Sequence, residues 1–223
     1  MTGQEMIDSF YQYYDRITNF SAPGYETDEV LLFLNNAQDE FIKDRAFGKG
    51  FQPPALEDNQ KRVADLRPLI TNITKSVAPG ASDGLHYTTG PSDYLYYITS
   101  MAKVTRTNPT INAEFVECKY IKNEEQKKFL HSAVNVTHHI NPVVFSDNYF
   151  TNNLWIQADS YTTISHIGLS YISQPTAIET GAASVLEDHT HQEIVDIAVR
   201  QALQVQQDPR WQSQVAEQKI KDE

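Results

Sequence analysis

Histidines have the widest range of possible chemistry in this sequence, and four of the seven occur in two close groups. His138 and His139 are adjacent, while one residue separates His189 from His191. Zinc requires three or four converging ligands, and adjacent residues of a strand point to opposite faces. Neither group has a third ligand at the spacing of a zinc motif. We predict no metal site, and we expect His189 and His191 to be solvated or capping residues at the start of a helix.

The carboxylates and serines form no recognisable catalytic motif. Asp39, Glu40 and Asp44 lie on the polar side of an amphipathic segment, where a solvated face is expected. Ser165-His166 lacks the G-x-S-x-G pattern of a nucleophile elbow. The glycines on either side of Lys49 follow a predicted helix and lack the spacing of a phosphate-binding loop, so they indicate a helix C-terminus. We predict no catalytic or cofactor-binding residues, and no cofactor.

Composition limits the classes of partner. The chain has 223 residues, a formal net charge of −11 and a pI near 5.0, which argue against a grip on free duplex DNA dominated by phosphate contacts. Its single cysteine, Cys118, lies in a strand-like alternation and is predicted to be a packed thiol. The sequence has no secretory signal and no apolar run of the roughly 20 residues needed to cross a bilayer. We expect synthesis in a cytoplasm and no membrane partner.

Four segments have helical periodicity. Thr2 and Glu5 have the spacing of a capping box before a helix that reaches Ile17, and Thr27 is a candidate cap for a second helix that ends near Gly48. A third helix is expected from about residue 55 to residue 70, broken near Pro68. Thr190 and Glu193 have a second capping-box spacing, before a helix that ends near residue 205.

The middle of the chain has the period-two pattern of strands. Residues 77–91 are rich in Gly, Pro, Ser and Thr and are expected to form a loop. The expected strands are 94–104, 113–121, 142–146, 154–158 and 163–172. The predicted fold class is therefore α+β, in which N- and C-terminal helices form a helical bundle with an inserted antiparallel β-sheet or small sandwich lobe. The predicted parts are 1–76 (helical), 77–182 (β-rich) and 183–223 (a C-terminal helix and tail that pack back on the first part).

Aromatic and basic residues are the candidates for contacts between proteins. The chain has twelve tyrosines and ten phenylalanines, more in the β-rich part than one sheet face can bury. Subunit contacts explain this excess, although a base-stacking or sugar-binding face would use the same residue types. Basic residues such as Arg45, Lys61 and Arg62 are either ordinary exposed charges or contacts to acidic partner helices. The predicted subunit or partner contacts are Tyr94, Tyr96, Tyr149, Phe150, Trp155 and Trp211.

Several segments resemble ring proteins from the head-to-tail connector of crAss-like tailed bacteriophages. The segments are Leu34-Asn-Asn-Ala-Gln-Asp-Glu-Phe41, Asn59-Gln-Lys-Arg-Val-Ala-Asp-Leu66-Arg-Pro-Leu-Ile70, Asn153-Leu-Trp155-Ile, Tyr171-Ile-Ser-Gln-Pro175 and His191-Gln-Glu-Ile-Val-Asp-Ile-Ala-Val199. They fall at the start, middle and end of the chain. The wider class, which includes adaptor and tail-tubular proteins, pairs a helical domain with a β lobe.

The resemblance implies a structural virion protein that is not an enzyme. Copies would form a closed, twelvefold ring below the portal protein, contact adjacent ring or tail proteins, and surround the passing genomic DNA without sequence-specific contact. The location would be the neck of the virion, after synthesis in the host cytoplasm. Two alternatives remain open: a tail or host-surface binding module that uses the aromatic β lobe, and a small hydrolase that uses Asp or His residues.

Overall fold

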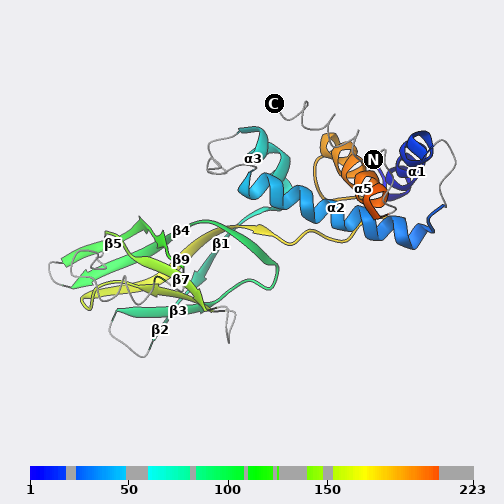
Figure 1. The fold of residues 1–223 in the computed structure, drawn as a ribbon. Helices are drawn as coiled ribbons and strands as arrows, with labels where there is room; N and C mark the ends of the chain where they lie inside the picture. Colours follow the sequence, from blue (N-terminus) through cyan, green and yellow to red (C-terminus); the bar gives the residue numbers. More distant parts are fainter. Residues whose placement is uncertain are drawn as a thin grey trace. The chain divides into compact units, whose positions relative to one another are not determined.

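The computed structural model divides the chain into two compact units (Figure 1). It describes residues 1–18, 24–48, 60–80, 84–107, 110–122, 125, 140–147 and 153–205. The helical unit comprises 1–69 and the chain from residue 175 onward, and the β unit comprises 70–174. The predicted mixed α+β class is confirmed, with helices and two sheets. We describe each unit by itself.

The helical unit is built from segments at both ends of the sequence. Its elements are α1 (Gly3–Thr18), α2 (Thr27–Phe47), α3 (Gln60–Leu66), the 3₁₀ turns η2 (Arg67–Leu69) and η3 (Asp188–Thr190), and α5 (His191–Val205). Helix α5 contacts both α1 and α2, and α3 contacts α2. Apolar residues at helical spacing, such as Met6, Leu34 and Ile194, are fully buried.

Tyr25, which lies just before α2, packs on rings of α1 and is hydrogen-bonded to α5. The rings of Phe10 and Tyr14 stack with their centroids 5.8 Å apart, and Tyr25 meets Tyr14 edge-on at 5.3 Å. The hydroxyl of Tyr25 donates to the carbonyl of Ala202 in α5 at 3.1 Å. A buried tyrosine gains stability when its hydroxyl finds such an acceptor.

The helix starts differ in part from the sequence predictions. The capping box of Thr2 and Glu5 is confirmed, since the backbone N–H of each residue donates a hydrogen bond to the side-chain oxygen of the other. For α2 the cap is Glu26 rather than Thr27. The predicted box of Thr190 and Glu193 is wrong, because the Thr190 hydroxyl donates to the Glu187 carbonyl and Glu193 pairs with arginine and lysine instead.

The β unit consists of two sheets. Sheet A has the order β1-β9-β4-β5, from β1 (Ile70–Ser76), β9 (Thr162–Ser173), β4 (Tyr94–Thr107) and β5 (Thr110–Glu117). Sheet B has the order β2-β3-β8-β7-β6, from β2 (Ala78–Pro79), β3 (Leu85–Thr89), β8 (Asn153–Gln157), β7 (Val143–Asp147) and β6 (Lys119–Tyr120). The chain passes from sheet A to sheet B twice, between β1 and β2 and between β5 and β6.

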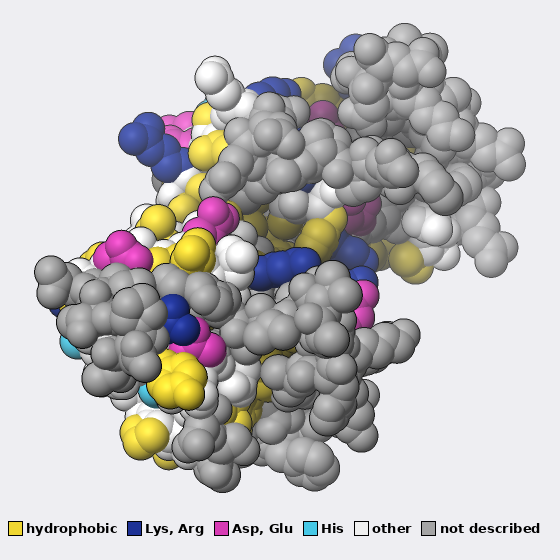
Figure 2. Space-filling model, turned by 90° about the vertical axis from the view of Figure 1, so that its left-hand side faces the viewer, with side chains coloured by type: hydrophobic (Ala, Val, Ile, Leu, Met, Phe, Trp, Pro, Cys, Tyr) yellow, Lys and Arg dark blue, Asp and Glu magenta, His cyan; other side chains and the backbone are white. Residues whose placement is uncertain are grey.

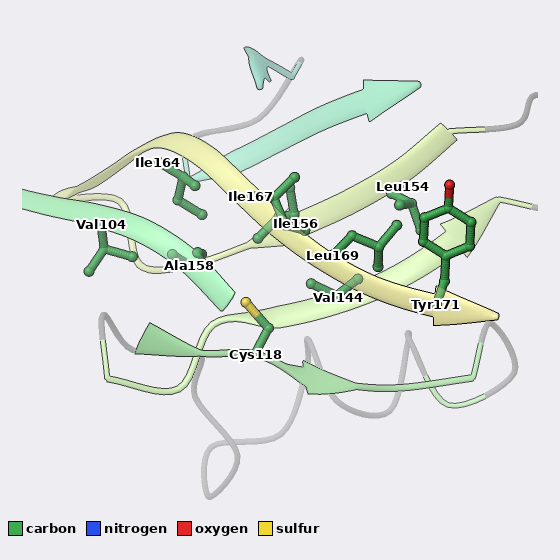
Figure 3. Close-up of a cluster of buried hydrophobic side chains, with 11 residues drawn as sticks. Val104, Cys118, Val144, Leu154, Ile156, Ala158, Ile164, Ile167, Leu169 and Tyr171 are labelled. Atoms are coloured by element: carbon green, nitrogen blue, oxygen red, sulfur yellow. The ribbon is translucent and has the colours of Figure 1, made fainter. Parts of the chain in front are cut away.

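The two sheets share one hydrophobic core (Figure 3). Ile164, Ile167 and Leu169 of sheet A meet Val144 and Ile156 of sheet B. Alternation along β8 places Leu154 and Ile156 in this core and Trp155 on the opposite face of sheet B. The sheets therefore pack face to face, and the alternation along β9 is interrupted between Ile164 and Ile167, where its register with β4 shifts.

Three strands and one pairing direction were missed by the sequence analysis. Strand β1 occupies residues assigned to the end of a helix and the segment that follows it, while β2 and β3 lie in the predicted loop 77–91. The predicted strand 113–121 is divided into β5 and β6, which belong to different sheets. β6 pairs with β7 in parallel, so the expectation of a purely antiparallel lobe is wrong at this edge. The predicted start of the third helix near residue 55 lies outside the described residues.

Candidate interaction surfaces

The predicted contact residues do not gather in one place. Tyr94 packs against the core shared by the two sheets, with its ring centroid 5.8 Å from that of Tyr171. Tyr96 is half-buried on the same strand, and Trp155 belongs to a separate cluster on the far side of sheet B. The other three predicted contacts, Tyr149, Phe150 and Trp211, lie outside the described residues.

A pair of stacked tyrosines joins sheet A to the β6 edge of sheet B. The rings of Tyr97 in β4 and Tyr120 in β6 stack with centroids 4.6 Å apart. The Tyr97 hydroxyl lies 2.9 Å from that of Ser100. Burial raises the pKa of Tyr97 to about 12, although the hydrogen bond with Ser100 acts in the opposite direction. Tyr97 is therefore neutral at physiological pH and serves packing rather than proton transfer.

The outward face of sheet B carries a row of three aromatic residues. The strand registers place Tyr87, Trp155 and Phe145 side by side across β3, β8 and β7. The rings of Tyr87 and Trp155 lie 5.2 Å apart, and both side chains are partly exposed, whereas Phe145 is buried. A partly exposed aromatic pair of this kind is a possible stacking platform for a ligand ring.

The outward face of sheet A exposes apolar side chains next to its β5 edge. Phe115 of β5 is 55% exposed and Met101 of β4 is 48% exposed. The ammonium group of Lys103 lies 5.9 Å from the centre of the Phe115 ring, an arrangement that favours a cation–π contact. Gly168 of β9 is paired with Met101 and leaves a flat surface beside it. In the view of Figure 2, hydrophobic side chains reach the surface between acidic and basic ones.

A buried carboxylate organises the charged residues of the helical unit. The Asp65 side chain is only 1% exposed, and its two oxygens lie 2.8 Å from Nε of Arg45 and 2.8 Å from Nε2 of His189. Arg45 also binds Glu193 of α5. Arg62 is buried and donates to the carbonyls of Arg45 and Ala46 at the end of α2. The acidic partners of Arg45 are therefore within its own chain.

Other charged and polar residues also differ from the solvated state that the sequence suggested. Glu40 accepts hydrogen bonds from Arg200 at 2.8 Å and from Gln201 at 2.7 Å, which joins α2 to α5. His191 is 2% exposed, and its Nε2 lies 2.9 Å from the carbonyl of Leu186. The contacts of Glu40 join positions far apart in the chain, which a periodicity argument cannot find. By contrast, Asp39 is exposed, as predicted.

Two potentially reactive side chains of the β unit, those of Cys118 and His86, have structural roles. Cys118 is buried, as predicted, and burial raises the pKa of its thiol to about 12, so it is not a thiolate at neutral pH. His86 accepts the backbone N–H of Ile164 at its Nε2, 3.3 Å away, so the ring proton belongs on Nδ1, which lies 3.4 Å from the Gly84 carbonyl. Burial lowers the pKa of His86, while the bond to Gly84 raises it.

The described parts of the chain lack a cluster of metal ligands and a helix that could span a membrane. Within those parts, no three His, Cys, Asp or Glu side chains are placed to hold one metal ion. No helix described in the structure has the length and apolar character needed to span a membrane. The pair His138 and His139 lies outside the described residues.

Comparison with known proteins gave no relative from which a function could be transferred. No protein-family model matches the sequence, and no curated protein matches it significantly. A functional conclusion therefore depends on the residues and surfaces described above.

Proposed function

We propose that the chain is a structural ring subunit of the head-to-tail connector of a crAss-like tailed bacteriophage. The observation that carries this proposal is the apolar surface on sheet A, where Phe115 and Met101 are exposed beside an edge strand. Exposed aromatic and methionine side chains are enriched where proteins meet. The sequence resemblance to connector rings specifies which kind of assembly this surface serves.

In this proposal the helices form one bundle, and the β unit is a lobe inserted into it. The contacts of α5 with α1 and α2 support that arrangement. Copies form a twelvefold ring beneath the portal protein at the neck of the virion, and adjacent ring or tail proteins bind its other side. The ring performs no chemistry and binds no cofactor. The C-terminal segment that includes Trp211 docks on the portal or the next ring, so a truncated chain should fail to stack.

The net charge of −11 suits a channel through which DNA slides. Negative side chains around the lumen would repel phosphates and prevent lasting contacts. A strongly basic lumen in the assembled ring would contradict this part of the proposal.

Electron microscopy tests the proposal directly. The purified chain is imaged alone and after mixing with the portal complex of its virus, and the particles are classified by rotational symmetry. Closed rings of portal symmetry, or rings that form only on the portal, are the expected result. A chain that remains monomeric in both samples would refute the connector function.

The aromatic pair Tyr87 and Trp155 favours one alternative, a tail or host-surface module that binds carbohydrate. Aromatic rings on a β surface can stack on the apolar face of a sugar. A glycan array probed with the full chain and with Trp155→Ala distinguishes the two functions. Binding by the full chain that the substitution abolishes would support the alternative, and no binding by either would leave the connector proposal.

A further inference from the structure

Sheet A has two long edges that could receive another strand. β1 forms one edge and β5 the other, and within the described residues neither edge is paired with a further strand (Figure 1). An unpaired edge is a template for pairing with another chain, and natural edges usually carry lysine, proline or a bulge that prevents it. β5 contains neither lysine nor proline and exposes Phe115, and the irregularity in its pairing with β4 lies before Glu114, so its regular edge begins at that residue.

Hydrogen bonds inside sheet A determine which backbone groups point away from it. The N–H of Val77 donates to Ser165 in β9, and the N–H of Cys118 donates to Ser100 in β4. Bonding alternates along an antiparallel pair. Continuing this alternation along the regular parts of the observed registers directs the peptide groups of Asn72, Thr74 and Ser76 outward from β1, and those of Phe115 and Glu117 outward from β5.

We propose that β5 of one copy pairs antiparallel with β1 of the next copy, with Phe115 opposite Thr74. This inference rests on the proposed function, because it describes how the subunits of the ring join. The regular part of β5, from Glu114 to Glu117, lies opposite the stretch of β1 from Lys75 to Asn72. Each uses the outward-directed peptide groups that the sheet leaves unpaired, so no internal hydrogen bond must break.

Side chains select this register among those that the hydrogen bonding allows. With Phe115 opposite Thr74, Val116 lies opposite Ile73, and both side chains pack on the core side of their sheet. Glu114 then lies opposite Lys75. A shift by two residues in either direction separates both pairs. Cross-strand pairs of β-branched residues and of opposite charges stabilise a sheet.

Charge and chain direction also fit a repeated, head-to-tail contact. β5 carries two glutamates and no basic residue, whereas β1 carries Lys75 and no acidic residue. Neighbours within sheet A are antiparallel throughout, so β5 and the next β1 continue the same alternation of direction. The core-facing sides of the two copies then lie on the same side of the joined sheet. A contact between two different edges repeats from copy to copy and can close into a ring.

Disulfide trapping tests the register in the full chain. Opposed residues of a hydrogen-bonded pair have Cα atoms about 5.5 Å apart, a separation that a disulfide can bridge. Within one copy, β9 and β4 lie between the two edges and keep them roughly 14 Å apart. A chain with Thr74→Cys and Phe115→Cys should therefore form a ladder of covalent multimers on oxidation. The native Cys118 is 5% exposed and should not contribute.

A matched control places the two cysteines on the same strands, at positions that the proposed register does not bring together. Ser76→Cys with Glu117→Cys uses the same two strands and the same outward positions, but the proposed register places these residues roughly 14 Å apart. A ladder from the first variant and little from the second is the expected result. Equal ladders from both, or none from the first, would overturn the proposed pairing.

Charge reversal gives a second test that does not depend on a variant folding well by itself. Lys75→Glu or Glu114→Lys, added to the first cysteine variant, should each reduce trapping at least about fivefold, because like charges then face each other. An equimolar mixture of the two variants should restore trapping. Opposite charges face each other wherever a copy of one variant joins a copy of the other. Lys43→Glu, on an exposed site of α2, should change nothing. Failure of the mixture to recover would count against the pairing.

The two experiments separate this inference from the proposed function. Rings seen by electron microscopy together with no ladder would overturn the edge pairing and leave the connector function standing. A register-specific ladder from a chain that never joins the portal complex would refute the connector function and keep the pairing.

Discussion

Replacing Asp65 with asparagine removes a buried negative charge while nearly preserving the side chain's volume. The carboxylate has two charge-assisted contacts at 2.8 Å, to Arg45 and to His189. The hydrogen bond with His189 is of a type that contributes about 1.5–3 kcal/mol, whereas the contact with Arg45 is an ion pair without hydrogen-bond alignment. Loss of one partner of a buried ion pair costs about 3–5 kcal/mol. Arg45 keeps Glu193 as a partner and is itself partly exposed, which reduces the cost. We expect the free energy of unfolding of the helical unit to fall by about 3 kcal/mol.

Native-state hydrogen exchange is the appropriate assay, because it reports free energies of opening region by region. Amides of α3 and α5 should lose protection in Asp65→Asn, while those of β8 in the β unit should not change and serve as an internal reference. Asp188→Asn is the control, since that carboxylate is 88% exposed and binds the N-terminal ammonium group. It should leave the protection of α3 unchanged.

A double-mutant cycle with Arg45→Gln separates the ion pair from other effects of the substitution. We expect a coupling free energy on the order of 2 kcal/mol between the two positions. A change of less than about 0.5 kcal/mol in Asp65→Asn, the range typical of surface substitutions, would refute the role assigned to this carboxylate.

Three further predictions concern the β unit. Ile156→Ala, at a fully buried position between the sheets, should lower the free energy of unfolding by about 2–5 kcal/mol in urea titrations; a loss below about 1 kcal/mol would contradict the packing described. Gly84→Ala should destabilise the unit by about 1–3 kcal/mol, because Gly84 has φ of 74° and the added Cβ would lie 2.5 Å from the carbonyl oxygen of Ala158; an unchanged melting temperature would be inconsistent with that geometry. Burial lowers the pKa of folded His86 below its usual 6.5, so the unfolded chain binds the proton more readily and stability should be lost as the pH falls below about 6.5; His86→Gln should show a smaller loss over this range, and identical pH profiles would exclude the effect.

Local patterns were enough to find most elements, because their signals repeat within a few residues. The 3.6-residue spacing of buried residues such as Leu34 and Ile194 located α2 and α5. Strand β1 was missed although its sequence, ITNITKS, is rich in β-branched residues, because a helical pattern that precedes it was extended too far. Two residues, Arg67 and Pro68, already lie in a 3₁₀ turn that ends the helix.

Contacts between distant segments could not be found in the same way. Asp65 meets His189 across 124 positions, and Glu40 meets Arg200 across 160. A charge on a helix surface has the same local pattern whether it faces water or a partner from elsewhere in the chain. The parallel pairing of β6 with β7 likewise depends on the chain leaving sheet A at Cys118, a choice made by the tertiary fold.

The division of the helical unit between both ends of the sequence has a consequence for synthesis. Residues 70–174 leave the ribosome as one continuous stretch, and the β unit can fold as soon as they have emerged. Helices α1 and α2 are made first but must wait for α5, which at about 5–20 residues per second emerges on the order of ten seconds later. We expect their apolar faces to be substrates for chaperones during that interval. Ribosome-bound chains that have exposed residues up to Gln174 should resist protease in the β unit and be cleaved in α1 and α2, and equal protection of both would contradict this order.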